Sequence, residues 1–516
     1  MGLPAARRAA AALPRLLLPP HAAATAAPWR GLASAAGGGD GGMLMRDFIH
    51  NSLYHPELGY FNRATPPLAR LPEPIQFGSL VGQAEYRLRL QQLYRELGVD
   101  WLTPAEVFRP WFGRSLAKFV LEERRHAWES SEPLLIVEIG GGTGTLAASV
   151  LDYIAEADPV LYSSTTYACL EISPRLSALQ TQTAARASRH AGAFLSLRAD
   201  ASRAEAWGRL AAALPPQHAA GGHAFVVMTE VLDNLPHDKI VRGGSGGGNG
   251  DSGSGWRETW VRRPGGGAAE ASGSGGGGGS GSGGGGSAAA PAEGAPPWVE
   301  ELRPASDPLV ARCMAAVLGP EAGGGGGGGG GGNASGRSWL QRVVDAALGS
   351  GGGPEAVWLP TRCLELLDAL HAARPRHTLI AADFDALPDV ALPGANAPLV
   401  SGRAAPGVAR DYKTVLVPWG AADIFFPTDF EALGRLYAAA AASGGDGGGG
   451  GGSKGRADGG RVSYRHMPTA EFVQALGLSR HTQTLSGWNP LLQDWPNTRF
   501  FLGSRGLPDT ARPARR

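Results

Sequence analysis

Short hydrophobic runs alternate with stretches of helical periodicity through the middle of the chain. Four runs have the length of buried strands, at 134–139, 166–171, 194–198 and 224–229. The segments between them space their apolar residues as helices do, at about 144–156, 174–190 and 202–213. This alternation predicts a doubly wound, mostly parallel α/β sheet.

Residues 43–130 precede this alternation and carry helical patterns, so we interpret them as an N-terminal helical cap. One helix start is specified in detail. Thr103 is a candidate N-cap, Pro104 suits the first helical position, and Glu106 completes a capping box. We expect one helix to continue from there through Val120.

The regular alternation breaks after the fourth strand. Segments 239–242 and 256–261 predict a hairpin, within an inserted region at 237–376 that also carries helices and is a candidate substrate region. The first part of the core therefore spans 131–236. The second part spans 377–505, with strands at 378–383 and 498–502, helices at 428–442 and 468–477, and a tail at 506–516.

Glycine tracts interrupt the second half of the chain. Glycine accounts for 79 of the 516 residues. Such tracts cannot bury enough apolar surface to offset the entropy of ordering them, so they predict disordered insertions. They lie at 264–290, 323–332, 349–353 and 444–452.

Composition and charge exclude several classes of protein. A net charge of +1 gives no electrostatic case for binding nucleic acid. Three scattered cysteines, Cys169, Cys313 and Cys363, argue against a disulfide framework or a zinc site, and no metal is predicted. Since no run of about twenty apolar residues occurs, no membrane span is predicted either.

The first 39 residues form an alanine-rich leader without a single acidic residue. Its basic residues are Arg7, Arg8, Arg15 and Arg30. An arginine-bearing, acid-free leader predicts a transit peptide for a mitochondrion or plastid, with a simple disordered tail as the alternative.

A glycine turn follows the first predicted strand, at Gly140, Gly142 and Gly144. Its G-x-G-x-G spacing differs from the G-x-G-x-x-G dinucleotide fingerprint. Glu138 just before the turn would repel a pyrophosphate, and Glu171 at the end of the second strand is placed to accept hydrogen bonds from ribose. These features together favour S-adenosylmethionine, a cationic and phosphate-free cofactor, over a dinucleotide.

Three further acids are candidates for the site because ligands of open α/β sheets bind at the carboxyl ends of the strands. Asp200 follows the third strand and could bind the adenine amino group, or cap the next helix. Glu230 and Asp233 follow the fourth strand and could hold a substrate and accept its proton. The alternative is that Glu230 is a solvated loop acid and that Asp233 caps a turn.

Several collinear motifs resemble the MidA family of S-adenosylmethionine-dependent methyltransferases, over most of residues 43–505. They are the glycine turn, Met45-Arg46-Asp47-Phe48, His55 through Phe61, Leu170 through Leu176, Thr229 through Pro236, and Ala421-Ala422-Asp423-Ile424. The resemblance implies a class I methyltransferase fold: a seven-stranded, Rossmann-like sheet with one antiparallel strand.

The resemblance also implies a function. A mitochondrial member of the family methylates an arginine of a respiratory complex I subunit and assists the assembly of that complex. Carried over, it implies a matrix enzyme with S-adenosylmethionine as cofactor, a protein substrate in complex I, and Glu230 and Asp233 in the catalytic loop. It also allows a homodimer.

The chain departs from the family pattern in three places. The segment from Asp100 to Phe108 only loosely matches the family's Asp-Phe-Ile-Thr-Ser-Pro-Glu. Gly141 and Thr143 stand where the family usually has proline and arginine, and Asp385 stands where it has glycine. These changes leave open a non-catalytic assembly chaperone that keeps the fold. A dinucleotide oxidoreductase is the third alternative, and Glu138 argues against it.

Overall fold

We describe the protein from a computed structural model. It describes ten stretches of the chain: 42–63, 67–127, 132–187, 190–219, 222–242, 255–264, 298–319, 356–405, 408–443 and 462–506. The predicted transit peptide, the tail and nearly all of the glycine tracts lie outside these residues. No helix within them is long and apolar enough to cross a membrane.

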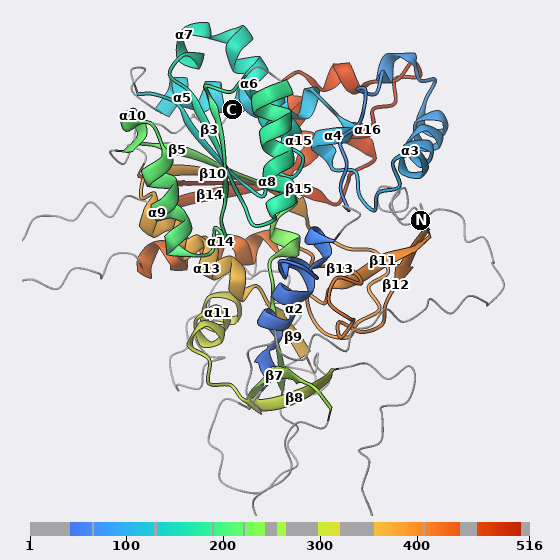
Figure 1. Ribbon diagram of the computed structural model, residues 1–516, viewed down its shortest axis with the longest axis vertical. Coiled ribbons are helices and arrows are strands. Elements are labelled where there is room, and N and C mark those ends of the chain that lie inside the picture. The colour runs from blue at the N-terminus through green and yellow to red at the C-terminus, as the bar shows by residue number, and fades with distance from the viewer. Residues whose placement is uncertain are drawn as a thin grey trace, which may run out of the picture.

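A seven-stranded sheet forms the core, with the strand order β14-β15-β10-β5-β2-β3-β4 (Figure 1). β15 runs antiparallel to both of its neighbours, and the other adjacent pairs are parallel. The strands are β2 (Leu135–Ile139), β3 (Thr166–Glu171), β4 (Phe194–Arg198), β5 (Ala224–Thr229), β10 (His377–Phe384), β14 (Val462–Pro468) and β15 (Thr498–Arg505). The predicted mostly parallel sheet with one antiparallel strand is therefore confirmed.

Helices cover both faces of this sheet because its central strands are apolar on both sides. Alternate residues of β2 enter different clusters, with Val137 on one face and Ile136 on the other. On the Val137 face lie α9 (Ala204–Ala213), α11 (Pro308–Leu318), α13 (Thr361–Ala373) and α14 (Phe430–Ser443). On the Ile136 face lie α3 (Gln83–Leu97), α4 (Pro104–Val107), α5 (Trp111–Ala127), α6 (Thr145–Ala157), α15 (Thr469–Ala475) and α16 (Pro490–Gln493).

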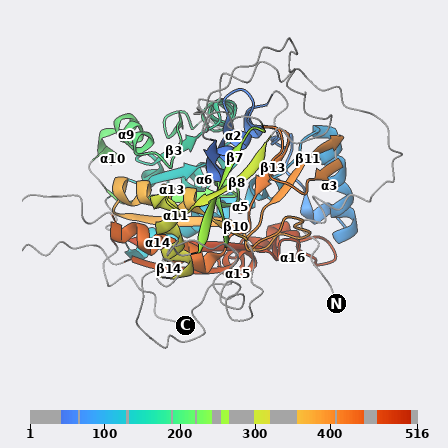
Figure 2. The ribbon, with the colours of Figure 1, turned by 90° about the horizontal axis from the view of Figure 1, so that it is seen from below.

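Short helices complete the covering. They are α7 (Pro159–Tyr162), α8 (Pro174–Gln180), a π-helix that continues α8 over Thr181–Ala187, and α10 (Pro216–Ala219). Seen from below, α9 and α10 lie on the opposite side of the molecule from α3 (Figure 2).

Two smaller sheets build a region beside the core. One contains β1 (Met43–Leu44), β6 (Asp238–Arg242), β7 (Trp256–Arg262), β8 (Val299–Pro304) and β9 (Ala356–Leu359). The other contains β11 (Leu399–Ala405), β12 (Val408–Asp411) and β13 (Asp423–Phe425). Helix α2 (Met45–Tyr54) packs with both, around a third hydrophobic cluster that includes Phe48, Trp358 and Phe426. We call these elements the accessory region.

The structure divides the segment 43–130 between two places. β1 and α2 join the accessory region, whereas α3, α4 and α5 pack on the core sheet. β11, β12 and β13 fall inside the segment predicted as the second part of the core, yet they also belong to the accessory region. The predicted hairpin is confirmed as β6 paired with β7.

The single helix expected from Thr103 through Val120 is wrong, because α4 and α5 are separate helices. Pro110 lies between them and has no N–H with which to continue the helical hydrogen bonds. The capping box is also wrong, since Thr103 makes no side-chain cap and Glu106 turns inward to other partners.

Candidate active site

A cavity of about 190 Å³ opens at the carboxyl ends of β2, β3 and β5. The core contributes the glycine turn and the loop after β5, and the accessory region contributes side chains from α2 and β13. The residues predicted from the sequence that line this cavity are Gly140, Gly142, Glu171, Asp200, Glu230 and Asp233. A smaller cavity under the same turn also has Gly140, Gly142 and Glu230 in its wall.

The three glycines of the turn all adopt positive φ, at +70° for Gly140, +51° for Gly142 and +81° for Gly144. A Cβ on Gly140 would lie 2.7 Å from the Val231 side chain, and one on Gly144 would lie 2.8 Å from Gln180 backbone. A Cβ on Gly142 would meet nothing within 4 Å. Gly142 is therefore the position where bare backbone faces open space that a ligand can occupy.

Glu138 lies beneath the turn, on the β2 face opposite Val137. Its carboxylate accepts hydrogen bonds from the Tyr167 hydroxyl at 3.0 Å and from the Cys169 thiol at 3.4 Å. Burial raises its pKa to about 7. It lines only the smaller cavity, so its charge is separated from the main cavity by the glycine turn.

Glu171 ends β3 in the wall of the main cavity. One carboxylate oxygen accepts the Ser173 backbone N–H, and the other accepts the Gln180 side-chain amide, both at 2.9 Å. Burial raises its pKa to about 7. These bonds fix the carboxylate, and the remaining lone pairs suit ribose hydroxyls.

Asp200 lies in the same wall, after β4. One of its oxygens accepts hydrogen bonds from the backbone N–H and the hydroxyl of Ser202. Helix α9 begins only at Ala204 and has Arg203 at its N-cap. The alternative role of Asp200 as the cap of this helix is therefore wrong.

Glu230 and Asp233 come together with Asp383, at the ends of β5 and β10. The Asp233 N–H donates to Asp383 at 3.2 Å. Burial raises the pKa of Asp383, and the charges of Asp233 and Glu230 raise it further. Glu230 adopts a φ of +54°. This left-handed backbone conformation costs a residue with a side chain of order 1–3 kcal/mol, and residues that adopt it are concentrated at functional sites.

The accessory region adds residues that sequence reasoning did not assign to the site. Tyr54 on α2 donates its hydroxyl to the Asn234 carbonyl at 3.0 Å. The Asn234 amide donates to Asp423 on β13 at 2.8 Å. The available signal for Asp423 was its place in a collinear motif, which did not reveal that β13 meets the loop after β5.

Glu106 holds the glycine turn from the other side. It accepts hydrogen bonds from the Thr143 hydroxyl, the Thr145 hydroxyl at 2.5 Å and the Leu71 N–H at 3.1 Å. The chain thus supports the turn through Thr143, at a position where the resemblance led us to expect arginine.

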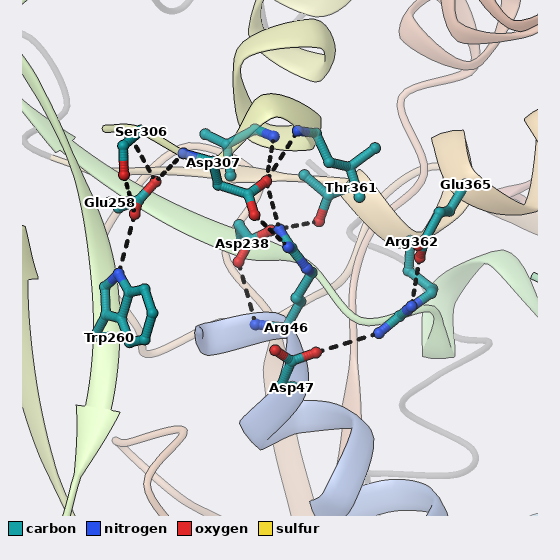
Figure 3. Close-up of polar contacts among 12 residues, drawn as sticks. Arg46, Asp47, Asp238, Glu258, Trp260, Ser306, Asp307, Thr361, Arg362 and Glu365 are labelled. Atoms are coloured by element: carbon teal, nitrogen blue, oxygen red, sulfur yellow. Dashed lines mark hydrogen bonds and ion pairs between the residues drawn. The ribbon is translucent and has the colours of Figure 1, made fainter. Parts of the chain in front are cut away.

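An ion-pair network anchors helix α2, which contributes side chains to the cavity (Figure 3). Arg46 bonds Asp238 and Asp307 at 2.6 Å each, and the Thr361 hydroxyl donates to Asp238 at 2.7 Å. Asp47 pairs with Arg362, which lines the cavity. Because His50 and Tyr54 lie further along α2 and also line the cavity, this network sets their position.

The residues present fit S-adenosylmethionine. The open backbone at Gly142 can accommodate the methionine part, Glu171 can bind the ribose, and Asp200 can bind the adenine. The walls hold five carboxylates, Glu171, Asp200, Glu230, Asp233 and Asp423, which suit a cation. Fold and site together define a class I methyltransferase architecture.

Comparison with known families agrees with this class. A family model described as "Putative S-adenosyl-L-methionine-dependent methyltransferase" matches residues 115–445, which is more than half of the 516 residues. The chain belongs to this family, and S-adenosylmethionine is its cofactor. The resemblance to the MidA family is thereby confirmed.

Comparison with one solved structure supports the fold. A crystal structure of a COG1565 superfamily member from Burkholderia thailandensis, bound to S-adenosyl-homocysteine, aligns with a TM-score of 0.52 at 17% identity, covering 93% of this chain and 92% of that chain. A native crystal structure of a COG1565 superfamily protein from the same organism aligns over the same shares at 17% identity with a TM-score of 0.48. No curated protein sequence matches the chain significantly.

Proposed function

We propose that this methyltransferase methylates an arginine side chain of a protein. The observation that supports the acceptor most directly is the group of carboxylates beside the cofactor cavity. Glu230 and Asp233 line the cavity, and Asp383 contacts Asp233 from the adjoining strand. A cluster of acidic side chains favours a cationic acceptor over a neutral one, because a cation offsets the repulsion between neighbouring carboxylates.

The chemistry required of these residues is limited. The cofactor supplies, when bound, a methyl group that its sulfonium already activates. A charged guanidinium is a poor nucleophile, and carboxylates beside it can orient its fork and localise its charge away from the reacting nitrogen. That nitrogen gains the methyl carbon and loses a proton, and Glu230 accepts the proton before passing it to solvent.

We further propose that the protein acts in the mitochondrial matrix, on a subunit of respiratory complex I during assembly. This part rests on the MidA resemblance and on the acid-free, arginine-bearing leader at 1–39. Mass spectrometry of methylarginine in complex I subunits, from cells with and without the protein, tests it. Identical methylation in the two samples would refute the proposed substrate.

Glu230→Gln tests the role of the carboxylate in the purified enzyme. The variant should bind S-adenosylmethionine as the wild type does and lose roughly 100-fold or more in turnover, as loss of a general base typically costs. Glu205→Gln is the matched control, because Glu205 is an exposed acid in the first turn of α9. Unchanged turnover in Glu230→Gln would remove its proposed role.

The assembly chaperone that the departures at Gly141 and Thr143 leave open predicts a different result. A variant unable to bind the cofactor would then still restore complex I assembly in cells that lack the protein. Failure of such a variant to restore assembly supports the enzymatic proposal.

A further inference from the structure

The cavity contains more carboxylates than its cofactor requires. Glu171 and Asp200 suit the ribose and the adenine, which leaves Glu230, Asp233 and Asp423. Glu230 and Asp233 follow β5 and belong to the core. Asp423 begins β13 and reaches the cavity from the accessory region. The remaining acids therefore come from two separate parts of the molecule.

Asp423 is held firmly in this position. The Asn234 side-chain amide donates to one Asp423 oxygen at 2.8 Å and to the Ile424 carbonyl at 3.3 Å. The Phe426 N–H donates to the Asp233 carbonyl at 2.8 Å. Three bonds thus join β13 and the residue after it to the loop that follows β5, which fixes Asp423 relative to Asp233.

The charge of Asp423 lies close to two phenols, one of which lines the cavity. Burial raises the pKa of Tyr54 and of Tyr60, and the Asp423 carboxylate is the next largest cause for both. Tyr54 lines the cavity. The Tyr60 hydroxyl donates to Asp100 at 2.8 Å and accepts the Trp101 indole N–H at 3.0 Å. Asp423 thus lies where β13 meets helix α2 and the segment that follows α2.

Aromatic rings form the wall beside this carboxylate. Trp101 and Phe425 both line the cavity and meet edge to face, with ring centroids 5.6 Å apart. The planar, weakly hydrated guanidinium of arginine stacks on such rings, whereas the compact lysine ammonium keeps its water more strongly. A carboxylate beside an aromatic wall is a recognition site for a flat cation.

We propose that Asp423 is a substrate-binding residue that, together with Glu230 in the wall of the same cavity, holds the guanidinium of an acceptor arginine and selects arginine over lysine. This inference rests on the proposed function and adds the residue that determines the acceptor class. The core thereby supplies the cofactor site and the proton acceptor, and the accessory region supplies part of the acceptor specificity.

The test measures the binding of two small probes, N-acetyl-L-arginine amide and N-acetyl-L-lysine amide, to the full chain saturated with S-adenosylhomocysteine. The wild type should prefer the arginine probe. Asp423→Asn should weaken arginine binding roughly tenfold to hundredfold, the usual effect of losing a charged hydrogen-bond partner. Asp423→Glu keeps the charge and should retain most of the preference.

Two measurements keep the result interpretable. Calorimetric affinity for S-adenosylhomocysteine should be unchanged in Asp423→Asn, which shows that the fold and the cofactor site persist, and Asp423→Ser provides a second variant if the asparagine impairs folding. Asp411→Asn removes an exposed carboxylate from β12 of the same small sheet and should bind both probes as the wild type does.

Unchanged arginine binding in a folded Asp423→Asn protein would overturn the inference and leave arginine methylation standing. If Asp423→Asn loses the same factor of affinity for both probes, Asp423 does not select arginine over lysine. A wild type that binds neither probe would refute arginine as the acceptor class, and the inference with it.

Discussion

Neighbouring residues of one sequence motif have different tasks in the glycine turn. Gly140 and Gly144 are glycines because a side chain would collide with Val231 or with Gln180 backbone. Gly140 and Gly142 both line the cavity, but among the three glycines of the turn only Gly142 leaves open space where a side chain would project. The same spacing that predicted a binding turn therefore contains two glycines required by packing and one that leaves room for a ligand.

Gly142→Val should abolish cofactor binding, because its side chain would enter the cavity. We expect affinity for S-adenosylmethionine to fall by at least roughly 100-fold, which corresponds to about 2.7 kcal/mol, as measured by calorimetry. Gly98→Val is the matched control. Gly98 has a similar φ of +61° and open space around it, yet it ends α3 outside the cavity lining. Gly98→Val should lose stability and keep its affinity for S-adenosylmethionine. If Gly142→Val binds the cofactor as tightly as Gly98→Val does, the assignment of Gly142 is wrong.

The sequence correctly predicted that residues at the ends of strands lie at the cavity. Glu171 and Asp200 follow successive parallel strands, so sequence order alone places them at one edge of the sheet. Glu106 and Asp423 could not be found in this way. Each acts on a segment far away in the chain, since Glu106 and Thr143 are 37 positions apart and Asn234 and Asp423 are 189 positions apart. Only the folded chain shows those contacts.

Helix α2 is the element that connects the accessory region to the cavity. Its first turn carries Arg46 and Asp47, and its later turns carry His50 and Tyr54. The first pair binds Asp238, Asp307 and Arg362 (Figure 3). The second pair lines the cavity. Ion pairs at one end of the helix thus help to position the side chains that line the cavity at the other end.

Arg46→Met should destabilise the protein by about 3–5 kcal/mol, the cost of leaving a buried carboxylate without its cation. Asp238 is 1% exposed, and burial raises its pKa even with Arg46 in place. Urea unfolding measures the loss. Arg89→Met is the control, because Arg89 is 41% exposed and approaches Glu96 only at 4.0 Å, so its removal should cost less than about 1 kcal/mol. A similar small loss in Arg46→Met would show that the network does not anchor α2.

Elements with strong periodicity were predicted well, and elements defined by tertiary pairing were not. The strands β2, β3, β4 and β5 lie within a residue of their predicted bounds. The strands β8, β11, β12, β13 and β14 escaped prediction. β8 and β14 are largely exposed, and β13 has only three residues. These three strands therefore lack a hydrophobic run long enough to identify from the sequence.

At the scale of the whole molecule, three hydrophobic clusters account for the architecture. Two lie on the faces of the core sheet, and the third joins α2 to the accessory sheets. The cluster on the Val137 face ends at a group of buried aromatic and imidazole rings. His371 lies 4.9 Å from His377 and 4.5 Å from Tyr437, measured between ring centroids. Since these imidazoles are enclosed by apolar packing, the stability of the fold is linked to pH.

Burial lowers the pKa of His371 from 6.5 to about 3. Below pH 6.5 the unfolded chain takes up a proton that the folded protein does not, so the stabilisation is present above pH 6.5 and is lost as pH falls toward 3. Between pH 6.5 and pH 5 the loss is about 2 kcal/mol, at about 1.4 kcal/mol per pH unit.

His371→Phe tests this linkage because phenylalanine cannot take up the proton. Between pH 7.5 and pH 5, the free energy of unfolding measured with urea should fall by about 2 kcal/mol less in His371→Phe than in the wild type. His126→Gln, which alters an exposed histidine of α5, should follow the wild type at both pH values. Parallel pH profiles for His371→Phe and the wild type would show that this imidazole is not the acid-sensitive group.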